Sequence, residues 1–475
     1  MVTAEKSRID CRHIDVLDGI RAVSVIIVLI FHFWQQTWIF PVIKTPWLAF
    51  VGITKIDFSN FATVGYLFVD MMVLISGFLL FLPLMRSIIL GEEMSSWKNY
   101  ARRRIARIVP SYYFAVLLLF FASALPTGAY ATTADALKDL FAHLTFTQTL
   151  WVNTYIATPL DVVLWTVAIE VWFYVLFPFV AEFIKGPRNK NRQSFTPAYG
   201  IFFIFAVFNI INYVYTENFV LKGNVYLAMR INQFPAFLGV YSIGMLGASA
   251  FVLIAKNCRR SRIFNAVNTL FSVFSILLIV YLINDCVATQ ERQVWQVTER
   301  SKLAFVFMTF IITTALSSKW YRWLFSNKFM RFLSGISYNL YIWHQWLAVQ
   351  CKNTWRIPKW SGEIPPNMLN ITYWMNRYAV ITVFAFAAAI LATYLIEKPF
   401  ANLIMGRPVF PFFAKKHLKT ANLTDEECIS EEESAPLSAE VDSFADTVDS
   451  DEPTENAAAN PWGEQETDRN DSDCD

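Results

Sequence analysis

The chain has 475 residues, of which 55% are hydrophobic, 16% are aromatic and only 16% are charged. Soluble domains carry about 25% charged residues, so a soluble protein of this composition would expose a large apolar surface. The composition favours a protein that lies in the lipid bilayer, and we expect no nucleic-acid partner. The formal net charge of +2 hides an uneven distribution, because 19 acidic residues and one basic residue lie between Asp425 and Asp475.

Ten segments are apolar and long enough to cross a bilayer as helices, which requires roughly 20 residues each. We therefore expect an all-α polytopic membrane protein, with a short cytoplasmic segment at 1–13, a transmembrane domain at 14–405 and a tail at 406–475. The ten predicted spans lie near 16–38, 62–84, 108–126, 162–184, 199–216, 232–255, 264–284, 303–319, 332–350 and 376–396.

The orientation follows from the basic residues in the connections, because cytoplasmic loops carry an excess of Lys and Arg. The N-terminus and every second connection, with Arg21 included, hold 27 basic residues, whereas the opposite connections, with Arg377 included, hold 12. We therefore expect a multi-pass protein of the cell membrane with both termini in the cytoplasm.

The first predicted span carries an arginine near its start and a histidine eleven positions later, Arg21 and His32. Eleven residues make about three helical turns, so both side chains lie on one face, about 16 Å apart along the axis. A guanidinium at the membrane edge suits a ligand that carries phosphate, and an imidazole near mid-membrane suits a general base. The alternative is that Arg21 anchors the topology and His32 is a packing residue.

Two carboxylates lie near the middle of the second and fourth predicted spans, Asp70 and Glu170. A charge at this depth is costly, so it indicates a functional residue by default. Either one could orient His32 or hold its imidazolium, and either could bind a sugar hydroxyl. The alternative is a buried ion pair that fixes helix packing. Tyr174 lies one turn after Glu170 and is expected to line the same cavity.

Four arginines lie where the third predicted span starts on the cytoplasmic side. Arg104 and Arg107 are three positions apart and share a helical face. With Arg21 they form a cationic patch that suits a multiply phosphorylated donor such as acyl-coenzyme A. We expect Arg102 and Arg103 to act as topology anchors beside anionic lipid.

The ninth predicted span contains His344, with Tyr341 one turn earlier. His344 is a candidate second proton-transfer group or acceptor contact, or else a residue of the interfacial aromatic belt. Glu397, at the end of the last span, is predicted to be structural, pairing with Arg21 or with the Arg104 cluster. Beyond about residue 421 the acidic composition predicts disorder and no chemistry.

Six sequence blocks follow one another along the chain. They are the Arg21–His32 pair in LDGIRAVSVIIVLIFHF, FVDMMVLISGFLL at 68–80, RRRIARIVPSYY at 102–113, LWTVAIEVWFYVLFP at 164–178, SYNLYIWHQW at 337–346 and IEKPF at 396–400. The same blocks occur in this order in the acyltransferase-3 family of integral membrane O-acyltransferases, and the chain resembles that family over about residues 10–405. One departure is the stretch after Asp70, where the family more often has aromatic residues.

The resemblance implies an O-acyltransferase that uses acyl-CoA, with acetyl-CoA as the common family case, and no metal. The acceptor would be a hydroxyl of an extracytoplasmic glycan, a lipid-linked sugar or a similar molecule. We assign catalysis to His32, Glu170, Asp70 and His344, and donor binding to Arg21, Arg104 and Arg107. Substrate contacts are assigned to Tyr174, Tyr341 and Trp165, which lies in the fourth block.

Two other classes of protein fit the same composition. A multispan transporter or flippase would also place charges at a membrane cavity, but it would show repeated halves with matching broken helices, and no internal repeat is evident. A membrane sensor or scaffold would depend on the acidic tail and would tolerate loss of Arg21 and His32.

Overall fold

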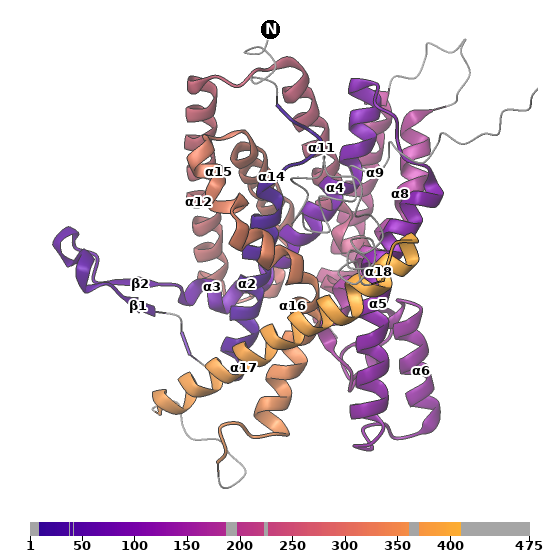
Figure 1. Cartoon of the computed structure of the whole chain (residues 1–475), viewed down its shortest axis with the longest axis vertical. Coiled ribbons are helices and arrows are strands. Elements are labelled where there is room, and N and C mark those ends of the chain that lie inside the picture. Colours follow the sequence, from indigo (N-terminus) through magenta and orange to yellow (C-terminus); the bar gives the residue numbers. More distant parts are fainter. Residues whose placement is uncertain are drawn as a thin grey trace, which may run out of the picture.

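The computed structural model describes residues 9–37, 39–40, 42–186, 197–222, 227–360 and 370–409. About four fifths of these residues are helical, as expected for an all-α membrane protein. The strands of the described part, β1 (Val42–Lys44) and β2 (Lys55–Asp57), form one antiparallel hairpin that projects from the helices (Figure 1). The predicted disordered tail falls almost entirely outside the described residues.

Eight helices of the described chain are long and apolar enough to cross a membrane, which establishes a multi-pass membrane protein. They correspond to eight of the ten predicted spans. They cover Val16–Thr37, Ser59–Leu90, Trp97–Ala124, Val162–Lys185, Pro197–Leu221, Leu227–Asn257, Arg262–Ala288 and Thr372–Met405.

The other two predicted spans fall in α14 (Arg300–Leu316) and α16 (Lys328–Asn353), which the short helix α15 (Lys319–Ser326) connects. By length and composition, this stretch meets the criteria for a membrane span only when its helices are taken together as one span, which is bent by 116°. α14 has 17 residues, and α16 carries many polar side chains, several of which lie buried inside the bundle. The described helices therefore support eight or nine spans on these criteria and do not establish ten.

The helices named above divide into shorter elements where the geometry changes. The remaining bounds are α2 (Val16–Thr37), η1 (Pro46–Val51), α3 (Ser59–Val64), η2 (Gly65–Leu67), α4 (Phe68–Leu90), α5 (Trp97–Leu119), η3 (Phe120–Ala124), α6 (Thr133–Leu144), η4 (Gln148–Leu150), α7 (Val152–Tyr155), η5 (Val162–Leu164), α8 (Trp165–Lys185), α9 (Pro197–Tyr215), η6 (Thr216–Leu221), α10 (Leu227–Ile231), α11 (Phe234–Asn257), α12 (Arg262–Ala288), α13 (Arg292–Thr298), α17 (Ile371–Ala392), η7 (Thr393–Glu397) and α18 (Lys398–Met405).

Glycines let the central helices α4 and α11 approach closely. A Cβ on Gly244 would lie 2.9 Å from both the Leu74 carbonyl oxygen and the Phe78 amide nitrogen, and a Cβ on Gly77 would lie 3.2 Å from Tyr241. Small residues at such contacts let two backbones meet and maximise van der Waals packing in lipid. This contact fixes Ser76 on α4 and Tyr241 on α11 relative to each other.

Helix α2 packs along α16, and the two run side by side through the centre of the molecule (Figure 1). Gly19 on α2 permits a tight contact with α15, since a Cβ there would overlap the Phe325 carbonyl oxygen at 2.0 Å. Because α2 packs along α16, the arginine and the histidine of the first span face the polar residues of α16.

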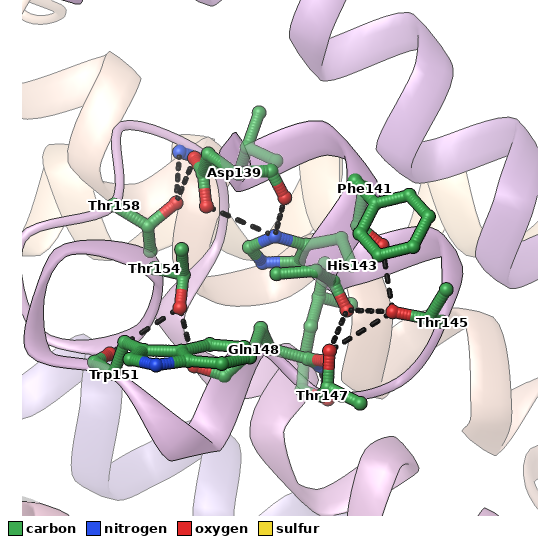
Figure 2. A network of polar contacts seen from close by, with 12 residues as sticks. Asp139, Phe141, His143, Thr145, Thr147, Gln148, Trp151, Thr154 and Thr158 are labelled. Atoms are coloured by element: carbon green, nitrogen blue, oxygen red, sulfur yellow. Dashed lines mark hydrogen bonds and ion pairs between the residues drawn. The ribbon is translucent and has the colours of Figure 1, made fainter. Parts of the chain in front are cut away.

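A polar network stabilises the connection between α5 and α8 (Figure 2). Asp139 and His143 are buried, and the His143 Nδ1 lies 3.1 Å from the Asp139 carboxylate. The hydroxyls of Tyr130 and Thr158 each donate to the same carboxylate at 2.8 Å. Tyr112 on α5 donates to the His143 carbonyl at 3.0 Å. His143 therefore joins α6 to α5.

Candidate active site

A cavity lies between six helices, α2, α4, α5, α8, α11 and α16. It offers about 80 Å³ of space to water-sized molecules. Polar and aliphatic side chains both line it. The lining residues are Arg21, Val25, Val69, Met72, Val73, Ser76, Arg107, Thr166, Val167, Glu170, Tyr241, Ser337, Tyr338 and Tyr341.

Two of the three predicted donor-binding arginines line this cavity, Arg21 and Arg107. They lie close enough for their like charges to interact. Arg21 also lies 3.9 Å from the Asp18 carboxylate, and its side chain is 14% exposed. Two guanidiniums that converge on one cavity, at the end where the span begins, form a site suited to phosphate oxygens.

The third predicted arginine, Arg104, lies behind this pair and outside the cavity lining. Its guanidinium carbon lies 5.4 Å from the Tyr100 ring centre and 5.0 Å from the Tyr174 ring centre, within cation–π range. Its Nε is buried and has no hydrogen-bond acceptor within the described part of the chain. The neighbouring Arg102 donates to the Ile404 carbonyl at 2.7 Å, which ties α5 to α18.

Glu170 occupies the cationic end of the cavity. It accepts hydrogen bonds from the Ser76 hydroxyl at 3.0 Å and from the Tyr174 hydroxyl. It also interacts electrostatically with Arg21 and Arg107. The carboxylate therefore balances part of the arginine charge and fixes Tyr174, which lies outside the lining.

His32 contacts a second histidine. Its Nδ1 lies 2.9 Å from the Nε2 of His344, which has no exposed surface. The Nδ1 of His344 lies 2.7 Å from the Tyr341 carbonyl oxygen and 3.1 Å from the Leu340 carbonyl oxygen. Because a carbonyl only accepts, we assign the His344 proton to Nδ1, so its Nε2 accepts from His32. This tautomer leaves the His32 Nε2 with a free lone pair.

The expected orienting carboxylate is therefore replaced by a histidine. Neither Asp70 nor Glu170 bonds to His32, and its side-chain partner in the described chain is His344. Sequence reasoning named both histidines but did not pair them. The sequence offered one signal for this pairing: the first and ninth predicted spans each carry a histidine and are expected to cross the membrane in the same direction.

The histidine pair adjoins the cavity at Tyr341. This tyrosine lines the cavity, and its ring centre lies 5.5 Å from that of His344. His32 itself is half-buried and is not among the lining residues. The arginines and the histidine pair thus lie at opposite ends of one helical face, with the Tyr341 ring between the cavity and the imidazoles.

Asp70 lies outside the cavity lining, in a buried ion pair. Its carboxylate lies 3.3 Å from the Nε of Arg300, and both side chains are almost fully buried. Arg300 also donates to the carbonyls of Ile231 and Ala236, each at 3.1 Å. The geometry corresponds to the packing alternative considered for Asp70, and Arg300 was not recognised from the sequence.

The remaining predicted residues, Trp165 and Glu397, do not line the cavity. Trp165 packs against Phe237 with ring centres 5.7 Å apart and does not line the cavity. Glu397 is buried in η7, accepts a hydrogen bond from Asn339 and interacts electrostatically with Arg107. It thus connects the last span to the arginine cluster.

Comparison with known proteins bears on this arrangement. A family model described as an acyltransferase domain matches residues 14–398. The chain belongs to this acyltransferase family. The match covers all the helices that line the cavity and both histidines. No solved structure matches the chain.

Among curated relatives, the acyltransferase chain is 26% identical over 355 residues to a protein of Staphylococcus aureus (strain COL) provisionally named an O-acetyltransferase. That match covers 70% of the chain and 50% of the relative. A provisionally named acetyltransferase of Acidianus two-tailed virus is 25% identical over 53% of the chain and 65% of the relative. The O-acetyltransferase OatA of Staphylococcus aureus (strain NCTC 8325 / PS 47) is 28% identical over 39% of the chain and 28% of the relative. The chain spans about half the length of the first of these.

Proposed function

We propose that the protein is a membrane O-acyltransferase that moves an acyl group, acetyl in the simplest case, from cytosolic acyl-CoA to a hydroxyl of an extracytoplasmic glycan or lipid-linked sugar. The observation that carries this proposal is the His32–His344 pair beside an arginine-lined cavity. The names of the relatives support oxygen as the acceptor atom and acetyl as the acyl group.

The donor binds with its phosphates at Arg21 and Arg107, and Arg104 adds charge from behind. Arg21 and His32 are about 16 Å apart along α2, a distance that an extended pantetheine arm covers to order of magnitude. The aliphatic wall of the cavity, including Val25 and Val73, accommodates that arm. Tyr341 must move aside for the thioester to reach His32.

The histidine pair supplies general base catalysis. The His32 Nε2 takes the proton of the acceptor hydroxyl while that oxygen attacks the thioester carbonyl carbon. The carbon–sulfur bond then breaks, and the imidazolium returns its proton to the coenzyme A thiolate. His344 orients His32 through the Nδ1–Nε2 hydrogen bond and stabilises the charged ring, as the third group does in other triads. In a second route the His32 Nε2 attacks the thioester carbonyl first, expels the coenzyme A thiolate and forms an acyl-imidazole. The acceptor hydroxyl then attacks this acyl carbon, which frees the imidazole, and the hydroxyl proton neutralises the thiolate.

This mechanism needs a donor on one side of the membrane and an acceptor on the other. We propose that α14 and α16 each cross the bilayer, giving ten spans with both termini in the cytoplasm. The support is the excess of basic residues at the end of the bundle where α2 begins. His344 would then lie beyond mid-membrane, toward the outer leaflet.

The test is coenzyme A release and acetyl transfer in membrane vesicles supplied with labelled acetyl-CoA. His32→Ala should lower the rate by about 100- to 10,000-fold, the range for loss of a general base. The matched control is His13→Ala, because His13 lies outside the spans with its side chain 40% exposed. Equal transfer by both variants at equal protein levels would remove His32 from the mechanism. No coenzyme A release by the unaltered protein would favour a transporter.

A further inference from the structure

A second cationic site lies at the opposite end of α2 and α16 from Arg21. Arg377, on the second turn of α17, has no exposed surface, and among the described residues its Nε and Nη1 have no hydrogen-bond acceptor. Its Nη2 donates to the Tyr373 hydroxyl. A buried guanidinium with two nitrogens unpartnered is costly, because each has lost its water without gaining an acceptor.

Aromatic rings surround this guanidinium. Its central carbon lies 4.8 Å from the ring centre of Trp360, 5.0 Å from that of Tyr373 and 5.2 Å from that of Trp374. Ring faces attract a cation but cannot accept the in-plane N–H groups as a carboxylate or phosphate does. The aromatic rings therefore hold the guanidinium charge in place, while its Nε and Nη1 donors have no acceptor among the described residues.

Other cations gather at the same place. Lys352 is close enough to Arg377 for their charges to repel, and the Arg356 guanidinium lies 5.4 Å from the Trp360 ring centre. Besides Lys352, the groups that act electrostatically on Arg377 in the part of the chain that the structure describes are Tyr373 and Cys351, which are neutral at pH 7. The like charges of Arg377 and Lys352 raise the free energy of the protein without a ligand and favour a bound anion.

The position of the cluster relates it to the histidine pair. Cys351, beside Arg377, lies seven residues beyond His344 on α16, which is about 10 Å along the helix. The residue after Arg377, Tyr378, packs on Phe33 with ring centres 5.5 Å apart, and Phe33 directly follows His32. The cluster is thus next to the imidazoles, on the side away from the donor arginines.

We propose that Arg377 and Lys352 bind a negatively charged group of the acceptor, a carboxylate or a phosphate, so that the acceptor is an acidic sugar or a sugar phosphate. This inference rests on the acyl-transfer function proposed above and adds the charge class of its acceptor. The half-buried Trp360, in the connection after α16, swings aside to admit the anion. The rings of Trp360 and Trp374 then pack against the sugar.

The experiment compares two soluble probes, methyl β-D-glucuronide and methyl β-D-glucoside. They differ only at C6, which is a carboxylate in the first and a hydroxymethyl group in the second. The full-length protein is held in nanodiscs of phosphatidylcholine, without acetyl-CoA, and binding is measured from the thermal shift and the tryptophan fluorescence. The glucuronide should bind at least ~10-fold more tightly than the glucoside, since a charge-assisted hydrogen bond contributes about 1.5–3 kcal/mol. Arg377→Gln should abolish that preference and leave the response to acetyl-CoA intact.

Two further variants keep the inference falsifiable. Lys352→Gln, at a half-buried position, should weaken glucuronide binding even if Arg377→Gln folds poorly. Lys302→Gln is the control, since its side chain is 62% exposed and pairs with Glu299. Equal binding of the two probes to the unaltered protein would overturn the inference. So would an Arg377-dependent response confined to nanodiscs that contain phosphatidylglycerol. The binding measurement contains no acyl donor and so does not depend on catalysis. If the protein selects the glucuronide but transfers no acyl group when acetyl-CoA is supplied separately, that result would count only against the enzymatic function.

Discussion

Replacement of His344 tests the geometry of the histidine pair more sharply than loss of His32. In His344→Leu the acceptor 2.9 Å from the His32 Nδ1 disappears while the apolar volume is largely kept. Loss of the partner of a buried donor costs about 1–3 kcal/mol and leaves the Val28 carbonyl as the remaining hydrogen-bond partner of the His32 ring. At 1.4 kcal/mol per factor of ten, acetyl transfer should fall by about 5- to 150-fold, with the KM for acetyl-CoA little changed.

The matched variant is His344→Gln, whose amide oxygen can replace the imidazole Nε2 as an acceptor. It should retain more activity than His344→Leu, because the His32 Nδ1 keeps a hydrogen-bond partner. The assay is transfer of labelled acetyl from acetyl-CoA to envelope material in membrane vesicles, normalised to protein level. The double variant His32→Ala with His344→Leu should be no slower than His32→Ala alone, since the two residues act as one unit. Fully additive losses, or an unaffected His344→Leu, would refute the assigned hydrogen bond.

Three further variants test other parts of the structure. Arg21→Gln should raise the KM for acetyl-CoA by about 10- to 150-fold with kcat nearly unchanged, because a phosphate contact contributes about 1.5–3 kcal/mol; a fall in kcat alone would argue against donor binding. Gly244→Val should lower the unfolding temperature in detergent, since its Cβ would meet the α4 backbone at 2.9 Å, whereas Gly335→Ala, with no atom within 4 Å of its Cβ, should not. Asp70→Asn should destabilise the protein by about 3–5 kcal/mol through the unpaired Arg300, seen as loss of folded protein on gel filtration; an undiminished yield would contradict a buried pair.

The spans could be predicted from the sequence because each one is a local property. Apolar length alone located the eight helices that meet the criteria for crossing a membrane. It was less informative for α16, whose polar residues Asn339 and His344 are buried within the bundle rather than exposed to lipid. A hydropathy average cannot distinguish a polar side chain that faces protein from one that faces water.

The site was predictable along one helix and not between helices. The separation of Arg21 and His32 places them on a single face of α2, and the cavity lies along that face at Arg21 and Val25. The pairings His32–His344 and Asp70–Arg300 join residues 312 and 230 positions apart. No periodicity within a segment specifies which distant helix it will contact. The charge of Asp70 was therefore evident, whereas its partner was not.

The distance in sequence between the two imidazoles has a consequence for biosynthesis. A ribosome releases His32 into the bilayer 312 residues before His344 follows. During that interval the nascent chain holds Arg21 but only one of the two imidazoles. Under the proposed mechanism, catalytic competence would therefore arise late in translation, and truncated products should insert without consuming the cell's acyl thioesters.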